Sequence, residues 1–342
     1  MHNDLFKLIT IFSITINGIL FFKQSHFNKS LIINNKEKEI NIYKQLLDLY
    51  FTNKEKFYAK GRDYIMKRKG IIYNETNSIT FQDKLNYLLI YESPEDKTNI
   101  VDKILLRNYS KNILGKDICT QILKIYNNVD EINLDKLPEK FVLKCNHGSG
   151  MNIFCDNKSK FNLSQAKYKL RHWLNINYGL LNFEYQYLNV KRKVFAEQYL
   201  ENDIINYKFS CFNGEPKFIR VKRNIKGINY YNIYNINWTL TKIELNYTDY
   251  VLNNDFQKPT NLKRMIKYAE LLSAKFAFCR VDFYEVNNII YLGEITFTPF
   301  NSKIKYKKKE TEIYLGNLID ISKIKSNHNV KYFTSDKSPY NH

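Results

Sequence analysis

The amino-acid sequence predicts an α+β fold that is preceded by a helical N-terminal region. Residues 36 to 70 carry apolar residues at helical spacing, as in IYKQLLDLYF, whereas the chain beyond about residue 140 alternates short apolar runs with turns. The chain has 342 residues, of which 44% are hydrophobic, so it is long enough for about two domains with packed cores.

The expected elements follow one another in order. Phe81 to Tyr91 is predicted to be an amphipathic helix, because Thr80 is placed to cap its start and Pro94 lies just past its end. Phe141 to Lys144 is a short apolar run that leads into a glycine-rich turn, which indicates a strand followed by a loop. The remaining expected elements are a helix over Leu163 to Leu174, a strand over Val194 to Leu200, a hairpin over Tyr207 to Val221 that turns at Asn213-Gly214, a helix over Asn261 to Ala274, and a hairpin over Phe278 to Phe297 that turns at Asn287 and Asn288.

The positive charge of the chain does not indicate a nucleic-acid partner. The formal net charge is +19, but the lysines are spread along the whole length, and the only dense run is Lys303 to Lys309. A nucleic-acid binder usually gathers its charge in one patch and interleaves it with aromatic residues. An AT-rich coding bias explains the excess of lysine, and we expect no nucleic-acid partner.

The cysteines favour a reduced, cytosolic compartment. The five cysteines are odd in number and show no C-x-x-C spacing, and the six histidines do not lie at zinc-ligand intervals. No structural metal site is therefore expected from these residue types.

One apolar run near the start bears on localisation. Leu8 to Phe22 is apolar over 15 residues, which is shorter than the roughly 20 residues that span a bilayer. A signal anchor, the apolar part of a signal peptide and a buried helix all fit it. Lysines and no small-residue cleavage site follow it, so the positive-inside rule would leave the body of the chain in the cytoplasm, at the inner face of the cell membrane if 8–22 is an anchor.

Polar and apolar residues alternate in two late segments, RVDFY (280–284) and GEITF (293–297). With a two-residue loop between the strands, Asp282 and Glu294 would point to opposite faces. With a three-residue loop, 287 to 289, or a bulged turn, Asp282 lies opposite Glu294 and Arg280 lies opposite Thr296. The register that buries the apolar residues also gathers the carboxylates, so we predict the longer or bulged turn.

Two carboxylates that face one another repel unless a cation lies between them. Magnesium takes one or two protein carboxylates together with phosphate oxygens, and Arg280 adds a fork for phosphate. The sequence therefore indicates a magnesium site at Asp282 and Glu294. The alternative is a structural salt-bridge cluster in which Arg280 pairs with both carboxylates.

The loop His147-Gly148-Ser149-Gly150 supplies a second group of candidates. Glycines let backbone N–H groups approach phosphate oxygens, and Lys144, at the end of the preceding strand, is placed to reach the same phosphates. It is not a Walker A motif, in which the lysine follows the glycines. Taken alone, the loop also fits an ordinary turn.

These segments together resemble the TupA-like branch of the ATP-grasp superfamily, which is associated with bacterial surface-polysaccharide and teichuronopeptide gene clusters. The resemblance runs from about Ser78 to Leu318 and rests on ITFQDKLNYL, VDKILLRNYSKNILG, KLPEKFVLKCNHGSG, VFAEQYL, NYKFSCFNGEPKFI and RVDFYEVNNIIYLGEITFTPF, in that order. It implies an ATP-grasp fold, in which two α+β subdomains clasp ATP. The expected divisions are 1–30 as the apolar N-terminal segment, 31–98 as the helical region, 99–193 as the N-terminal or lid subdomain, 194–322 as the C-terminal subdomain with the magnesium-binding hairpin, and 323–342 as a polar tail.

The resemblance also implies roles for the residues that match the family pattern. On the nucleotide side, Arg107 and Lys144 take the places of the two phosphate-contacting basic residues. The segment against adenine is Glu197, Gln198, Tyr199 and Leu200.

On the transfer side, Asp282 and Glu294 take the places of the magnesium-binding carboxylates, and Arg280 that of the arginine at the transferred phosphoryl group. Lys208 and Arg223 are further candidates for the acceptor or phosphate side. Thr296 stands where the superfamily usually has an asparagine ligand, which weakens the case for a second magnesium ion.

The implied activity is an ATP- and Mg²⁺-dependent ligation. A carboxylate attacks the γ-phosphate, and an amine then attacks the resulting acylphosphate. The expected partners are ATP and a polysaccharide or precursor that carries carboxylate or amine groups. Two alternatives stay open: a glycosyltransferase or kinase acting on surface glycans, and a non-catalytic basic module that binds an acidic polymer or a membrane.

Overall fold

The computed structural model describes residues 29–67, 78–92, 94–200, 204–226, 228–247, 250–252, 256–322 and 324. The apolar segment 8–22 and nearly all of the tail 323–342 lie outside these residues. Within the described ranges, no helix is both long enough and apolar enough to span a bilayer.

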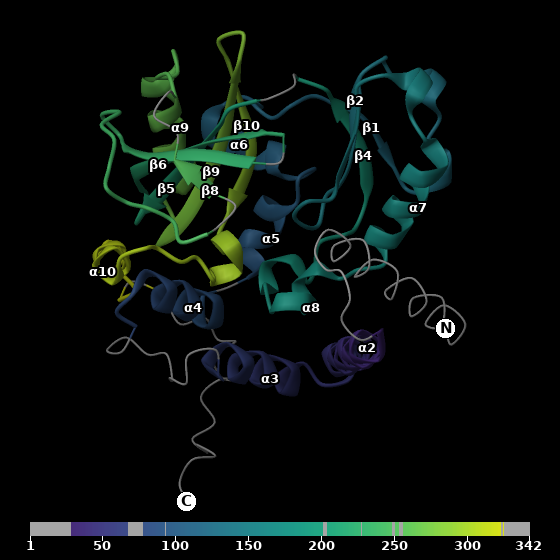
Figure 1. Ribbon diagram of the computed structural model, residues 1–342, viewed down its shortest axis with the longest axis horizontal. Helices are drawn as coiled ribbons and strands as arrows, with labels where there is room; N and C mark the ends of the chain where they lie inside the picture. The colour runs from purple at the N-terminus through teal and green to yellow at the C-terminus, as the bar shows by residue number, and fades with distance from the viewer. Residues whose placement is uncertain are drawn as a thin grey trace, which may run out of the picture.

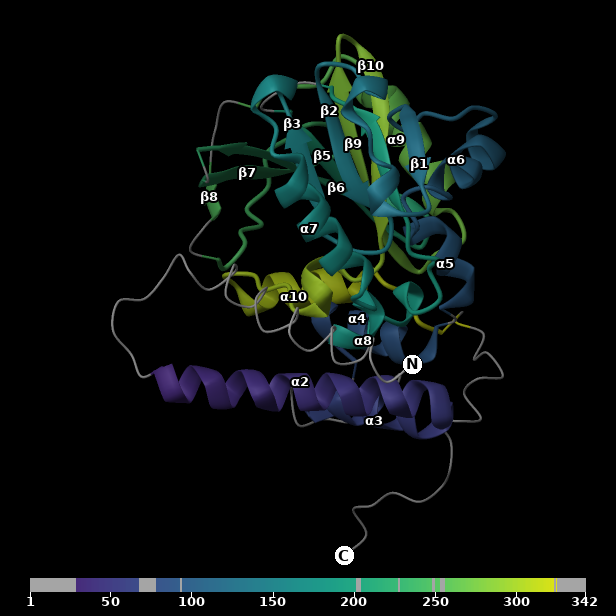
Figure 2. The same ribbon diagram turned by 90° about the vertical axis from the view of Figure 1, so that its right-hand side faces the viewer.

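Helices dominate the N-terminal part, as expected. α2 (Lys29–Thr52) and α3 (Lys54–Lys67) form a layer beneath the rest of the molecule (Figure 2). Phe57 of α3 joins this layer to the rest of the molecule. Its ring contacts the ring of Tyr50 in α2, with 5.2 Å between centroids, and that of Phe183, with 5.8 Å between centroids. α4 (Phe81–Tyr91) begins with the capping box that Thr80 predicts. The next two helices are α5 (Glu95–Val101) and α6 (Leu106–Leu114).

A four-stranded antiparallel sheet follows, in the order β1-β4-β2-β3. α7 (Leu163–Leu174) packs Ala166 and Leu170 into one apolar core with Phe141. The strands of this four-stranded sheet are β1 (Ile122–Tyr126), β2 (Phe141–Cys145), β3 (Asn152–Cys155) and β4 (Val194–Gln198). Because β4 pairs within this sheet, the change from one sheet to the other falls after Gln198, not after residue 193; the strand's own pattern does not show which sheet it joins.

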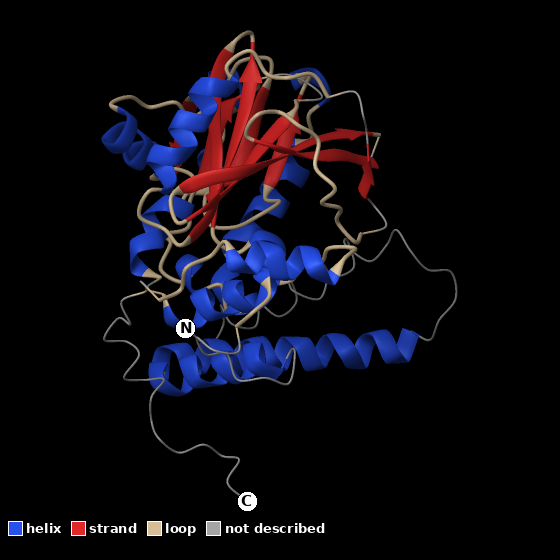
Figure 3. Ribbon diagram, turned by 90° about the vertical axis from the view of Figure 1, so that its left-hand side faces the viewer, coloured by secondary structure: helices blue, strands red, loops and turns tan. Residues whose placement is uncertain are grey.

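The second sheet has six strands, in the order β10-β9-β5-β6-β7-β8, and lies beside the first (Figure 1). α9 (Leu262–Ser273) covers one face, packing Met265 and Leu272 into a core with Val281. α10 (Lys309–Asn317) packs on α4 (Figure 1), and helices lie between the sheets and the layer of α2 and α3 (Figure 3). The strands are β5 (Asn206–Phe212), β6 (Glu215–Ile225), β7 (Ile228–Asn235), β8 (Tyr250–Leu252), β9 (Phe278–Val286) and β10 (Ile289–Thr296).

Short helical turns connect these elements. They are α8 (Tyr178–Asn182) and the 3₁₀ segments η1 (Val129–Glu131), η2 (Leu134–Lys136), η3 (Lys158–Lys160), η4 (Tyr185–Tyr187) and η5 (Pro299–Ser302).

The β9–β10 hairpin pairs Asp282 with Glu294, as predicted, through a bulge in β10 and not through a longer loop. The three-residue loop is wrong: Ile289 pairs with Val286, so the loop holds two residues, and both asparagines have positive φ, 51° and 60°. The extra residue is a β-bulge at Gly293, between the pairs Leu292–Phe283 and Glu294–Asp282. A Cβ at Gly293 would lie 2.6 Å from the Tyr284 ring, so any side chain at the bulge would have to displace this ring.

Candidate functional site

A row of charged residues crosses four neighbouring strands of the six-stranded sheet. In register, Arg220 on β6 pairs with Lys208 on β5, Lys208 pairs with Asp282 on β9, and Asp282 pairs with Glu294 on β10. All four therefore lie on the face opposite α9. The hairpin alternation predicts the last two members of this row.

Asp282 is the centre of the row. Its carboxylate, 1% exposed, accepts two hydrogen bonds from Arg280, at 2.6 and 2.7 Å, and forms an ion pair with Lys208. Burial alone would raise the pKa of this carboxyl, but Arg280 and Lys208 hold it well below its usual range. Asp282 is therefore ionised at neutral pH.

Arg280 joins both carboxylates. A terminal guanidinium nitrogen also donates to Glu294 at 2.8 Å and to the Thr296 hydroxyl at 3.2 Å. Burial opposes the charge on Arg280, but Asp282 and Glu294 outweigh it and raise the pKa of the guanidinium. Burial lowers the pKa of Lys208 to about 8, with Asp282 offsetting part of the shift.

Arg280, Lys208, Asp282 and Glu294 thus form the salt-bridge cluster that was the alternative to a magnesium site. The same residues also suit a magnesium ion that is bound together with phosphate. Two opposed carboxylates, Asp282 and Glu294, are oxygen ligands of the kind that magnesium takes. Their two negative charges are already balanced by Arg280 and Lys208, so a divalent cation needs further anions, which phosphates supply. In the described part of the chain no group of three or more His, Cys, Asp or Glu residues forms a complete metal site.

A cavity of about 530 Å³ lies between the two sheets, beside this row. Lys144 of β2 lines it and forms an ion pair with Glu197 of β4. The predicted adenine segment, Glu197 to Leu200, lines it as well. From the six-stranded sheet come Asn206, Lys222 and Tyr284. The volume suits a nucleotide-sized ligand.

The glycine-rich loop lies between β2 and β3. His147 is buried, with Nε2 3.0 Å from the Trp173 carbonyl, and burial lowers its pKa to about 4, so the ring is neutral at pH 7. Gly150 has φ 74°, and Ser149 is exposed. Of these residues, Gly148 makes the contact that matters for the site: its carbonyl accepts a hydrogen bond from Lys103 at 2.5 Å.

Lys103 is a site residue that the sequence analysis missed. It lies in the turn between α5 and α6, where Asp102 accepts from two backbone N–H groups and from the Asn146 side chain at 2.9 Å. These bonds tie the turn to the glycine-rich loop. Burial lowers the pKa of Lys103, and the nearby charges that act on it include Glu294, one of the paired carboxylates, and Lys144, which lines the cavity. The local sequence Val101-Asp102-Lys103 does not predict this position, because the hydrogen bond between Asp102 and Asn146 joins residues that are far apart in the sequence.

Two expected residues are not among those that line the cavity. Arg107 nevertheless lies next to it, because it donates at 2.8 Å to the carbonyl of Thr120, which does line the cavity, as well as to Asp117 at 2.9 Å. Arg223 of β6 pairs with Tyr230 of β7, and its side chain lies on the opposite face of the sheet from Lys208. A bulge between the pairs at Ser210 and Cys211 causes this, since counting from the Asn213-Gly214 turn without it would give Arg223, not Arg220, the face of Lys208.

Comparison with known proteins decides the family. A family model described as TupA-like ATPgrasp matches residues 83–320, more than half of the chain. The chain belongs to the TupA-like ATP-grasp family. Membership confirms the expected ATP-grasp fold and supports ATP binding and ligase-type chemistry at the general level.

This TupA-like protein is also similar to solved structures. D-alanine--D-alanine ligase from Bacillus anthracis, complexed with ATP, is 18% identical over 69% of this chain and 72% of that chain, with a TM-score of 0.40. N5-carboxyaminoimidazole synthetase from Staphylococcus aureus, complexed with ADP, is 15% identical over 62% and 48%, with a TM-score of 0.36. L-amino acid ligase from Bacillus licheniformis is 13% identical over 58% and 40%, with a TM-score of 0.35. No curated protein sequence matches the chain.

Proposed function

We propose that this protein is an ATP- and Mg²⁺-dependent ligase that activates a carboxylate as an acylphosphate for attack by an amine. The observation that carries the proposal is the pairing of Asp282 with Glu294, next to Lys208 and Arg280, beside a cavity that holds Lys144. This arrangement joins a nucleotide-sized pocket to an opposed pair of carboxylates that suits magnesium.

The nucleotide would lie between the two sheets. Glu197 to Leu200 offer backbone groups to the adenine edge, and Lys144 and Lys103 face the phosphates from the four-stranded side. Asp282 and Glu294 would hold magnesium, which neutralises charge on the phosphate oxygens when it is bound. Arg280 steadies the developing charge on the transferred phosphoryl group.

The reaction balances without a protein nucleophile. A carboxylate oxygen of the acceptor attacks the γ-phosphorus and ADP leaves; the amine then attacks the acyl carbon, and phosphate leaves with that oxygen. A deprotonated amine is required, and the proton that it loses goes to solvent. We place this chemistry in the biosynthesis or modification of a cell-surface polysaccharide, in the cytoplasm or at the inner face of the membrane, because of the resemblance to the TupA-like branch.

Isotope transfer tests the proposal. Purified full-length protein is given ATP, Mg²⁺, a panel of ¹⁸O-carboxylate uronic and amino acids, and amine acceptors. We expect ADP release, and one ¹⁸O atom per phosphate released. A glycosyltransferase would instead consume a sugar nucleotide and leave ATP intact, and a kinase would leave the label in a phosphorylated product.

Matched variants locate the activity. Glu294→Gln is expected to reduce ADP release by about 100-fold or more, whereas Glu215→Gln, an exposed glutamate at the start of β6, is expected to leave it unchanged. Equal rates in the two variants would contradict the assignment of the carboxylate pair. A non-catalytic module would show no ADP release in any variant.

A further inference from the structure

Arg220 is a buried arginine without an anionic partner. Three lysine and arginine residues of the described chain are less than a tenth exposed: Lys97, Arg220 and Arg280. Lys97 pairs with Glu92, and Arg280 pairs with Asp282. Arg220, 8% exposed, makes no hydrogen bond or ion pair with any described residue, and its Nε is fully enclosed without a partner.

A buried positive charge of this kind is unfavourable unless a ligand supplies the negative counter-charge. A buried cation loses its hydration, and in folded proteins a counter-charge normally compensates. The Phe300 ring, 4.9 Å from the guanidinium carbon, compensates only in part. Burial and the positive charge of Arg280 lower the pKa of Arg220, and Asp282, which already pairs with Arg280 and Lys208, offsets only part of this shift.

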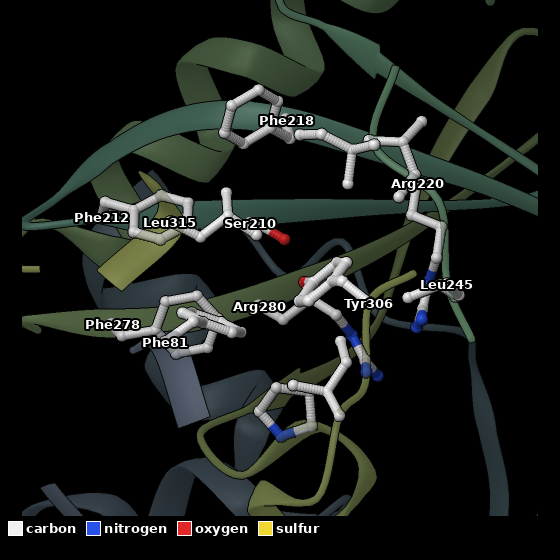
Figure 4. Close-up of a pocket in the computed structure, with 14 residues that line it drawn as sticks. Phe81, Ser210, Phe212, Phe218, Arg220, Leu245, Phe278, Arg280, Tyr306 and Leu315 are labelled. Carbon is white, nitrogen blue, oxygen red and sulfur yellow. The ribbon is translucent and has the colours of Figure 1, made fainter. Parts of the chain in front are cut away.

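Arg220 lines a small chamber on the same face of the sheet (Figure 4). Ser210 and Tyr306 add hydroxyl groups, and neither hydroxyl makes a hydrogen bond with the described residues. Arg280 also lines the chamber, and its guanidinium points to the same side as that of Arg220 (Figure 4). The remaining wall is largely apolar and includes Phe212 and Phe218.

The size of the chamber selects the anion. Its volume is about 30 Å³, and one water-sized group needs roughly 10 to 15 Å³. The space therefore accepts about two to three water-sized groups, which fits the three heavy atoms of a carboxylate but not the five of a phosphate group. A guanidinium fork binds a carboxylate in two places.

The position of the chamber relates it to the reaction. Lys222, two residues from Arg220 along β6, lines the nucleotide cavity, so the chamber and the cavity lie about 7 Å apart along the strand. Lys208 stands between Arg220 and the carboxylate pair in the cross-strand row. A carboxylate bound at Arg220 would therefore lie on one side of Lys208, and the γ-phosphate, which the proposed function places near Asp282 and Glu294, would lie on the other.

We propose that Arg220, with Ser210 and Tyr306, binds a second carboxylate of the acceptor, one that does not react. The acceptor of the proposed ligase is then an acid with at least two carboxylates, one activated near Asp282 and the other held in the chamber. The substrate class rests on the proposed function, but the carboxylate site at Arg220 does not.

Formate, the smallest carboxylate, probes the site directly. Isothermal titration compares the wild type, Arg220→Met and Lys217→Met, the last being a control because Lys217 is half-exposed on the same strand. We expect Arg220→Met to weaken formate binding by about tenfold or more and Lys217→Met to leave it unchanged. Equal formate affinity in all three proteins would overturn the proposal.

Two further readouts exclude other roles for Arg220. Affinity for a non-hydrolysable ATP analogue with Mg²⁺ is expected to be the same in Arg220→Met and the wild type; a tenfold loss would assign Arg220 to the nucleotide and overturn the proposal. The melting temperature of Arg220→Met without formate is expected to equal or exceed that of the wild type, because an uncompensated charge is removed. A fall would make Arg220 a structural residue.

The two proposals fail separately. If formate binding depends on Arg220 but no ATP analogue binds, the ligase function is wrong and the carboxylate site stands. If ADP release occurs, Arg220→Met is expected to raise KM for acceptors with two carboxylates by about tenfold and to leave kcat and the KM of their monoesters unchanged. An equal KM for both acceptor types in the variant and the wild type would refute the substrate class.

Discussion

Asp282→Asn is expected to destabilise the protein as well as to inactivate it. The substitution leaves Arg280 and Lys208 without the carboxylate that accepts from both, and removing one partner of a buried ion pair costs about 3 to 5 kcal/mol. Arg280 keeps its bond to Glu294, whose side chain is 33% exposed, so we expect the lower end of this range, about 3 kcal/mol.

Urea unfolding followed by tyrosine and tryptophan fluorescence measures this loss. Asp130→Asn is the matched control, since Asp130 pairs with Arg171 on the surface and such pairs contribute less than about 1 kcal/mol. A loss of less than about 1 kcal/mol for Asp282→Asn would refute the reasoning, because it would mean that the cluster contributes no more than a surface pair.

The pH dependence gives an independent check. The pKa of Asp282 is lower in the folded than in the unfolded protein, so its stabilisation is complete above the unfolded pKa of about 4 and is lost as the pH falls through the folded value. The difference in stability between the wild type and Asp282→Asn should therefore be constant from pH 5 to 7 and shrink in strongly acid solution.

Three further outcomes are expected. We expect kcat to fall as the pH rises through about 8, the pKa of the Lys208 ammonium group, and Lys208→Arg to move this decline to higher pH; an identical pH profile in the variant would contradict a catalytic role for Lys208. Lys103→Met should weaken ATP-analogue binding by about tenfold or more, since a charged donor is lost, while Lys111→Met, an exposed lysine on α6, should not; titration calorimetry tells them apart. Gly293→Ala should push the Tyr284 ring, 2.6 Å from the new Cβ, toward the nucleotide cavity that it lines, lowering both nucleotide affinity and stability, the latter by about 1 to 3 kcal/mol; unchanged affinity would show that the ring moves elsewhere.

The sequence predicted most elements because their signals are local. The Thr80 cap, the Asn213-Gly214 turn and the alternation around Asp282 depend only on neighbouring residues, and the structure has all three. The loop length was wrong because a longer loop and a bulge restore the same alternation, and residue patterns do not separate the two. The two-residue loop is formed by asparagines that tolerate positive φ.

The rest of the site depends on pairing between distant segments. Lys103 enters the site through the Asp102–Asn146 bond, and Arg220 shares a face with Lys208 because of a bulge in β5–β6. Neither residue carries a local signal. Both become visible only when the register of the sheet is known.

The bulge at Gly293 divides β10 into two stretches with opposite alternation. On the turn side, Ile290 and Leu292 enter the apolar core; past the bulge, the even-numbered residues Glu294 and Thr296 turn to the charged face. The hairpin tip can therefore be lengthened or shortened by whole residue pairs without moving the carboxylates. If the bulge were lost and Gly293 paired regularly with Asp282, Glu294 would lie opposite Val281 and turn into the core, while Ile295 would turn toward Arg280, so this one bulge decides whether the strand carries chemistry.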